Sequence, residues 1–224
     1  MTQLRILTYN VQSLRRSPDG VARVIRACAP DIVCLQEVPR FLFAPTRLAR
    51  LAADSEQHVA VHQRRTGLAV LARWGIAPEA ATTMLLPSRP GRHQRGLAVS
   101  SLRVGTARFA IATVHFGLDA AERQGQALLI VAELARTGLP VVVAGDINEE
   151  PGAPAFDLLA THYTDAHSDV GQGRGATFVS WSPERRIDAL FVDPRLTVLD
   201  CAVVEHPEAS TASDHRPVVA TLAW

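Results

Sequence analysis

Residues 140–148 read PVVVAGDIN, an apolar run that ends abruptly in a polar motif. Such a run is typical of a buried strand, and it places Asp146 and Asn148 at the strand's end. We expect these two side chains to share a face, because they stand two positions apart. The same arrangement recurs in five further motifs, which are TYN (8–10), LQE (35–37), TVH (113–115), RID (186–188) and SDH (213–215).

The motifs deliver carboxylates, amides and two histidines to the ends of separate strands. Hard oxygen ligands combined with imidazoles suit a divalent cation and phosphoryl chemistry. Glu37 is the first candidate metal ligand, since a carboxylate directly after the apolar run IVCLQ would be poorly placed in a core unless a cation neutralised it. Any one motif is weak, but the ordered set is specific.

Length and composition favour one large domain spanning residues 1–224, with 47% hydrophobic residues and a net charge of +1. That charge balance does not demand a nucleic-acid or membrane partner. The three cysteines have no metal-ligand spacing, and we expect Cys28 and Cys34 to be small core residues in a reducing, cytoplasmic protein. The N-terminal segment has no secretory-signal pattern, and no apolar stretch reaches transmembrane length, so we expect no membrane insertion. We further expect a monomer.

Periodicity and capping signals predict alternating helices and strands. We expect helices over Val21–Cys28 (after a turn cluster at Ser17–Gly20), Thr46–Ala53, from an Asp119 cap through Leu134, and over Ala155–Ala160. Pro87–Gly96 reads as a loop and Tyr163–Thr177 as a flexible one. The expected strands are Leu4–Tyr9, Asp31–Gln36, His58–His62, Gly67–Ala72, Gly96–Leu102, Arg108–Val114, Pro140–Ala144, Ile187–Val192, Thr197–Val204 and Pro217–Leu222. So many strands exceed one comfortable open sheet, which predicts an α/β (α+β) fold of two packed sheets with helices outside.

From Tyr9 to Pro217, the ordered motifs resemble the endonuclease/exonuclease/phosphatase superfamily, which has the DNase I-like fold. The resemblance implies a four-layered α/β/β/α sandwich of two mostly antiparallel sheets, with the site at the top of both. It also implies hydrolysis of phosphoester bonds that depends on Mg²⁺ or Mn²⁺.

The same resemblance implies catalytic roles for five residues. Asp146 would orient or deprotonate the attacking water, and Asn148 would hold the phosphate or that water. Asp188 and His215 would form a unit in which the carboxylate fixes the imidazole tautomer and raises its basicity. His115 would stabilise charge in the transition state or protonate the leaving oxygen.

The implied metal ligands are Glu37, Asn10, which would assist the metal or a phosphate oxygen, and Asp214, which would bind the same or a second ion. Two positions depart from the family pattern. Gln12 stands where an acidic residue or Asn is common, and Gly96 stands where the nuclease branch has a glutamate that supports its histidine.

Two residues are candidates for substrate binding. Arg95 opens a strand after the arginine-rich segment SRPGRHQRG and could clamp a phosphate, or the segment could be a solvated loop. Trp181 could form a wall for a base or another leaving group, or it could be a stacked core residue.

The leading function is therefore a phosphodiesterase of nuclease type, in which a water molecule attacks phosphorus in line. Nucleic acid (DNA or RNA) or nucleic-acid ends are the slightly preferred substrate. Lipid or inositol phosphates are the alternative, because all of these substrates present the same group. A hypothesis of another class is a catalytically silent binding module on the same fold.

Overall fold

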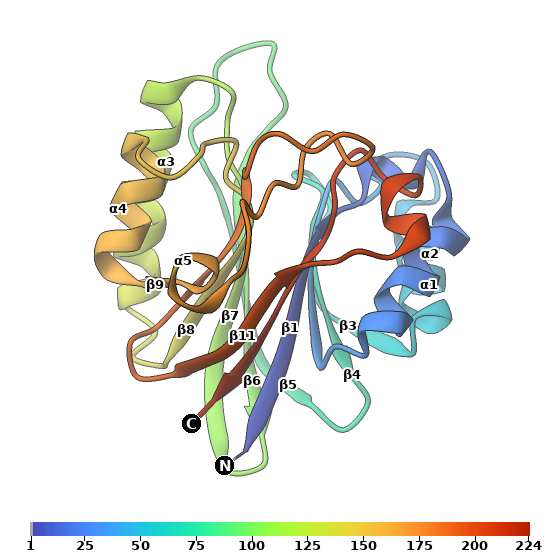
Figure 1. The fold of residues 1–224 in the computed structure, drawn as a ribbon, viewed down its shortest axis with the longest axis horizontal. Coiled ribbons are helices and arrows are strands. Elements are labelled where there is room, and N and C mark those ends of the chain that lie inside the picture. The colour runs from blue at the N-terminus through green and yellow to red at the C-terminus, as the bar shows by residue number, and fades with distance from the viewer. Residues whose placement is uncertain (1) are drawn as a thin grey trace.

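Two six-stranded sheets face each other in the computed structural model, which describes residues 2–224 (Figure 1). The first sheet, in the order β11-β12-β1-β2-β4-β3, contains β1 (Gln3–Asn10), β2 (Ile32–Gln36), β3 (Gln57–Gln63), β4 (Leu68–Arg73), β11 (Thr197–Val203) and β12 (Val218–Ala223). The second, in the order β5-β6-β7-β8-β10-β9, contains β5 (Ala77–Leu85), β6 (Gly96–Val104), β7 (Ala107–His115), β8 (Val141–Asp146), β9 (Thr164–Asp165) and β10 (Asp188–Val192).

Helices cover the outer face of each sheet. α1 (Pro18–Cys28) and α2 (Ala44–Asp54) lie against the first sheet, while α3 (Ala120–Ala135) and α4 (Pro154–His162) lie against the second (Figure 1). Short α5 (Ala166–Val170) lies beside β10 and β11, and 3-10 turns cover Gln12–Leu14 and Pro207–Ser210. Each sheet has a single parallel pair, β1 with β2 and β7 with β8. The predicted four-layered sandwich of mostly antiparallel sheets is confirmed.

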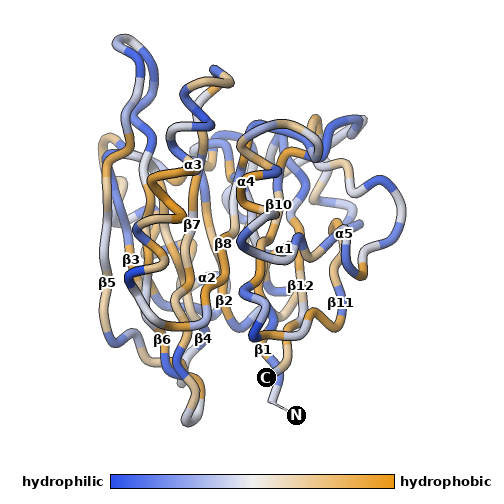
Figure 2. The backbone as a smooth tube through the Cα atoms, turned by 90° about the vertical axis from the view of Figure 1, so that its left-hand side faces the viewer, coloured by the Kyte–Doolittle hydropathy of each residue, from blue (hydrophilic) through white to orange (hydrophobic). Residues whose placement is uncertain are grey.

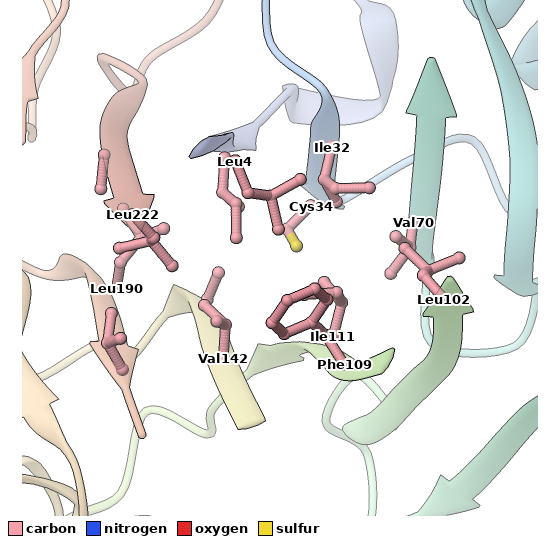
Figure 3. Close-up of a cluster of buried hydrophobic side chains, with 14 of the residues drawn as sticks. Leu4, Ile32, Cys34, Val70, Leu102, Phe109, Ile111, Val142, Leu190 and Leu222 are labelled. Carbon is pink, nitrogen blue, oxygen red and sulfur yellow. The ribbon is translucent and has the colours of Figure 1, made fainter. Parts of the chain in front are cut away.

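Three apolar layers hold these elements together. The central layer lies between the sheets, where Leu4, Ile32 and Leu222 of the first face Phe109 and Val142 of the second (Figure 3). The other two layers lie between each sheet and its helices. The strands are accordingly hydrophobic along much of their length, whereas the loops at the two ends of the sheets are largely hydrophilic (Figure 2). All three cysteines are free and buried, as expected for Cys28 and Cys34.

The structure corrects three local predictions. Ser17–Gly20 is not a separate turn, because Ser17 accepts a hydrogen bond from the Gly20 amide and so caps α1, whose first turn holds Pro18. Strand β5 was not predicted, since it is an edge strand that is mostly exposed and shows no apolar alternation. Tyr163–Thr177 is not one loop, because it contains β9 and α5.

A buried ion pair orders that segment. Arg186 forms a two-pronged contact with Asp165, at 3.0 and 2.6 Å, and its guanidinium lies over the ring of Phe156. Asp165 also caps α5 by accepting a hydrogen bond from the His167 amide. The glycines of this segment, which suggested a flexible loop, follow α5. The ion pair between Arg186 and Asp165 orders the residues that precede them.

Candidate active site

Strand register places three ionisable side chains in a row across the second sheet. His115 at the end of β7 pairs with Asp146 at the end of parallel β8, and Asp146 pairs with Asp188 at the start of antiparallel β10. The first sheet brings Asn10 to the end of β1, where it pairs with Gln36. These strand ends lie at the upper end of the molecule in Figure 1, opposite the N-terminus.

The two sheets meet at Asp146. Its Oδ2 accepts a hydrogen bond from the Asn10 side-chain amide at 3.0 Å and lies 3.2 Å from His115 Nε2 and 3.8 Å from His215 Nε2. Burial raises the Asp146 pKa to about 6; the charge of His215 and the Asn10 hydrogen bond oppose this rise, while the nearby Asp188 carboxylate adds to it. A carboxylate with such a pKa can exchange a proton near neutral pH.

His215 and Asp188 form the pair that the resemblance implies. His215 Nδ1 lies 2.8 Å from Asp188 Oδ2, and Thr177 donates its hydroxyl hydrogen to the same oxygen at 2.5 Å. Burial lowers the His215 pKa, but the carboxylates of Asp188 and Asp146 outweigh it and raise that pKa to about 10. The two carboxylates therefore favour the protonated imidazole in the metal-free protein, and Nε2 lies 3.8 Å from Asp146 Oδ2.

His115 differs sharply from His215. Burial and the charges of Arg95 and His215 depress its pKa well below 6.5, so the ring is neutral. Its register partner across β6 is Gly96, where the sequence departs from the nuclease pattern. Within residues 2–224 its Nδ1 has no hydrogen-bond partner. The missing glutamate thus leaves this histidine without a carboxylate on Nδ1 and unsuited to be a strong general acid.

Glu37 and Asp214 lie on the open side of the buried groups, and both are half-buried. Glu37 Oε1 lies 3.4 Å from the Asn10 amide nitrogen. Asp214 accepts a hydrogen bond from the Gln12 side chain at 2.8 Å, and the Gln12 backbone amide donates to Asn10 Oδ1 at 3.1 Å. Gln12 therefore links Asp214 to Asn10 through hydrogen bonds, at the position where the family resemblance led us to expect an acidic residue or Asn.

The side chains present suit a divalent cation. Asp146, Asp188 and His215 offer ligand atoms that all lie within 4.8 Å of one another, and they could hold a metal ion. Asp188 Oδ1 is buried and has no hydrogen-bond partner in residues 2–224, and such an oxygen is stabilised by a nearby cation. Glu37 and Asp214 add carboxylate oxygens that solvent can reach. Their assignment with Asn10 as the metal ligands stays a prediction.

Asn148 does not continue the strand, so the prediction that it shares a strand face with Asp146 is wrong. β8 ends at Asp146, and Asn148 has a left-handed backbone with a φ of 55°. Its backbone amide donates to Asp146 Oδ1 at 3.0 Å, and its side-chain amide donates to the Phe116 carbonyl at 3.0 Å. The role of Asn148 in binding a phosphate or the attacking water stays a prediction.

Arg95 lines a cleft of about 300 Å³ beside these groups, together with residues of the preceding loop and of the β7–α3 connection. Burial lowers its pKa, while the nearby carboxylates of Asp146 and Glu37 act in the opposite direction. Within residues 2–224 its guanidinium makes no ion pair or hydrogen bond, in contrast to Arg89, which pairs with Asp119 at 3.0 Å. Arg95 is thus a free, half-buried cation at the site.

Trp181 is 54% exposed, so its interpretation as a stacked core residue is wrong. The Arg16 guanidinium lies 4.7 Å from the ring centroid, and Arg16 also donates to the Gln12 side chain at 2.8 Å. The neighbouring Ser180 donates its hydroxyl hydrogen to the Ser213 carbonyl at 2.7 Å, beside Asp214. Trp181 therefore stands at the rim of the site.

A buried polar layer under the site was not assigned a role from the sequence. Gln36 donates its side-chain amide to Thr113 at 2.9 Å and to Thr8 at 3.1 Å, which links the two sheets below Asn10 and Asp146. Ser213 donates its hydroxyl hydrogen to the Asn10 carbonyl at 2.6 Å. The motifs could have indicated this layer, because each of these polar residues comes one or two positions before a candidate site residue in its motif.

Comparison with known proteins identifies the family. The sequence profile of the Endonuclease/Exonuclease/phosphatase family matches residues 7–215. The chain belongs to this family. A search of curated proteins found no match.

Solved structures of the family share the fold at low identity. An endonuclease/exonuclease/phosphatase from Bacteroides vulgatus is 22% identical with a TM-score of 0.83, covering 100% of this chain and 99% of that one. A mannosyl-6-phosphatase from Bacteroides thetaiotaomicron is 19% identical with a TM-score of 0.83, covering 99% and 100%. Danio rerio TDP2, complexed with a single-strand DNA product, is 17% identical with a TM-score of 0.79, covering 100% of both chains. Identities this low show the fold alone.

None of the helices in residues 2–224 has the length and apolar character needed to cross a bilayer.

Proposed function

We propose that this protein is a divalent-metal-dependent phosphodiesterase in which Asp146 activates a water for in-line attack on phosphorus. The observation that carries the proposal is the convergence of Asp146, the His215–Asp188 pair and His115 at three neighbouring strand ends. A binding module would have no need for a buried carboxylate 3.8 Å from a buried histidine that a second carboxylate holds at 2.8 Å.

Each side chain has a distinct task in this proposal. Asp146 accepts the proton of the attacking water, and Asn10 keeps its carboxylate in place. His215 presents an imidazolium hydrogen on Nε2 to a phosphoryl oxygen, and Arg95 binds a second oxygen of the same phosphate. His115, being neutral, offers a hydrogen bond without charge. A Mg²⁺ or Mn²⁺ ion bound by Glu37, Asp214 and Asn10 would neutralise charge that develops on phosphorus.

The preferred substrate in this proposal is nucleic acid or a nucleic-acid end. The exposed face of Trp181 at the rim of the site can stack on a base, and the arginine beside it can meet a phosphate. Lipid and inositol phosphates present the same phosphoryl group without a base. The protein would act as a cytoplasmic monomer.

Hydrolysis of bis(p-nitrophenyl) phosphate with added Mg²⁺, Mn²⁺ or chelator tests the reaction class. Asp146→Asn should lower kcat by on the order of 10² or more, because a general base contributes about that much. Asp200→Asn, which removes an exposed carboxylate on β11, is the matched control. Full turnover in chelator or by Asp146→Asn would overturn the proposal. A parallel panel of single-stranded DNA, nicked plasmid, phospholipid and inositol phosphates then identifies the substrate.

A further inference from the structure

Phe41, Leu42 and Phe43 form an apolar knob on the surface. They are 77, 76 and 69% exposed, and they are three large hydrophobic residues in succession between β2 and α2. The other large hydrophobic residues that are exposed within residues 2–224 stand singly or, at Leu128 and Leu129 on α3, as a pair. Single exposed apolar side chains are ordinary, but a contiguous run marks a contact surface.

Arginines without acidic partners lie in and near the knob. The Arg40 guanidinium lies 5.6 Å from the Phe41 ring centroid, and Arg64 donates to the Arg40 carbonyl at 3.0 Å. Arg47 lies in α2, and its guanidinium donates to the Leu14 carbonyl at 3.0 Å. None of these three arginines forms an ion pair with a carboxylate in residues 2–224, and residues 38–53 contain no Asp or Glu.

Several arginines elsewhere on the surface pair with carboxylates. Arg103 and Arg108 both pair with Glu79, at 3.0 and 2.6 Å, and Arg73 pairs with Asp31 at 2.7 Å. The unpaired guanidiniums beside the knob make this surface locally positive, although the net charge of the whole chain is only +1. The occupant of this surface must therefore be both anionic and able to accept apolar side chains.

We propose that the apolar knob and its arginines dock the protein on an anionic lipid bilayer. The three side chains enter the boundary between headgroups and acyl chains, while Arg40, Arg47 and Arg64 remain at the level of the lipid phosphates. A spanning helix is not needed for such peripheral binding. The docking does not depend on the proposed hydrolase activity, and it holds the end of β2, which carries Glu37, near the bilayer.

Two other occupants fit the surface less well. A second copy of the chain would bury about 400 Å² of knob per copy, about half of what each partner contributes to a standard interface. A single-stranded nucleic acid needs flat aromatic faces in succession, but Leu42 in the middle has none, and Arg40 lies over the ring of Phe41. Three highly exposed apolar side chains beside unpaired arginines match a lipid surface better than either.

Flotation with vesicles tests the proposal directly. The full chain should bind phosphatidylcholine vesicles that contain about 30% phosphatidylglycerol, and should bind neutral vesicles at least about tenfold more weakly. F41S/L42S/F43S should weaken the binding by on the order of 100-fold, because the apolar contribution is lost. L128S/L129S removes exposed apolar side chains from α3 and should bind as the wild type does.

A charge variant keeps the test valid if the triple variant fails to fold. R40Q/R64Q should weaken binding by about tenfold, with the loss masked at high salt, whereas R103Q/R108Q should bind normally. Absence of binding by the wild type, or equal binding by F41S/L42S/F43S, would refute the proposal.

Size-exclusion and DNA-binding measurements complete the test. If only dimerisation or only single-strand binding depends on the knob, the surface has one of the other occupants. D146N should bind vesicles as the wild type does, which separates docking from catalysis.

Discussion

Asp188→Asn is the substitution that examines the site most directly. The carboxylate holds His215 Nδ1 at 2.8 Å, and it is the first of the groups that raise the pKa of this histidine to about 10. Relative to the ordinary value of 6.5, that pKa corresponds to about 5 kcal/mol of net stabilisation of the imidazolium. Asparagine has the same shape and can still accept a hydrogen bond, so packing is preserved while the charge is removed.

Burial lowers the His215 pKa, and without Asp188 only Asp146 and the more distant Asp214 oppose it. We therefore expect Asp188→Asn to lower the His215 pKa strongly in the metal-free protein. Because the folded-state pKa of the wild type is raised, the pair's contribution to stability is complete below pH 6.5 and is lost as the pH rises through about 10. The difference in unfolding free energy between wild type and Asp188→Asn should shrink over that same interval.

Long-range ¹H–¹⁵N spectra of the imidazole ring, recorded in chelator between pH 6 and 10, measure the protonation state of His215 directly. Urea unfolding at the same pH values measures stability, with Asp200→Asn as the control for loss of one negative charge. A His215 that stays protonated at pH 9 in Asp188→Asn would refute the assignment of Asp188 as its charge partner. A loss of kcat on the order of 10² should accompany the change in pKa.

The remaining predictions concern the metal, the substrate and the fold. Glu37→Gln should raise the Mg²⁺ concentration that gives half-maximal activity, and an unchanged metal titration would remove Glu37 from the ligand set. Arg95→Ala should lower kcat/KM by an amount that corresponds to about 1–3 kcal/mol of lost transition-state stabilisation, with little change in melting temperature. Arg95→Lys should recover only part of that loss. Steady-state kinetics on each phosphodiester measure both effects. Gly96→Ala should destabilise the protein by about 1–3 kcal/mol in urea unfolding, because its Cβ would lie 2.8 Å from the Met84 carbonyl oxygen. Gly125→Ala, in open space on α3, should instead stabilise by about 0.5–1 kcal/mol.

Local signals sufficed for most of the fold. Asp119 caps α3 by accepting a hydrogen bond from the Glu122 amide, as predicted, since capping involves residues only three apart. Buried strands such as β8 were visible as apolar runs. β9 and α5 were not, because they depend on the contact between Arg186 and Asp165, which lie 21 positions apart. No local pattern shows which distant arginine will order a polar segment.

The motifs indicated which residues could converge, and register explains why they do. His115, Asp146 and Asp188 become neighbours because three adjacent strands place their functional ends at the same level. The hydrogen bonds that connect the site residues could not be predicted from the sequence. That Gln12 binds Asp214 depends on the left-handed turn after β1, where the φ of Gln12 is 45°. Such a conformation is uncommon for residues other than glycine, and sequence patterns do not anticipate it.

The two buried histidines show how one substitution in a strand changes the chemistry of a site. Asp188 against Nδ1 favours the charged form of His215, while burial and then the charge of Arg95 lower the pKa of His115, which has Gly96 as its register partner. Gly96 cannot simply be replaced by a carboxylate-bearing residue, since Gln63, Thr66 and the Met84 carbonyl fill the space beside it. In the proposed function, His215 and Arg95 therefore share the negative charge of a bound phosphate with the metal ion, and His115 contributes a neutral hydrogen bond. This division of labour makes Asp188, rather than any partner of His115, the second carboxylate on which the proposed chemistry depends.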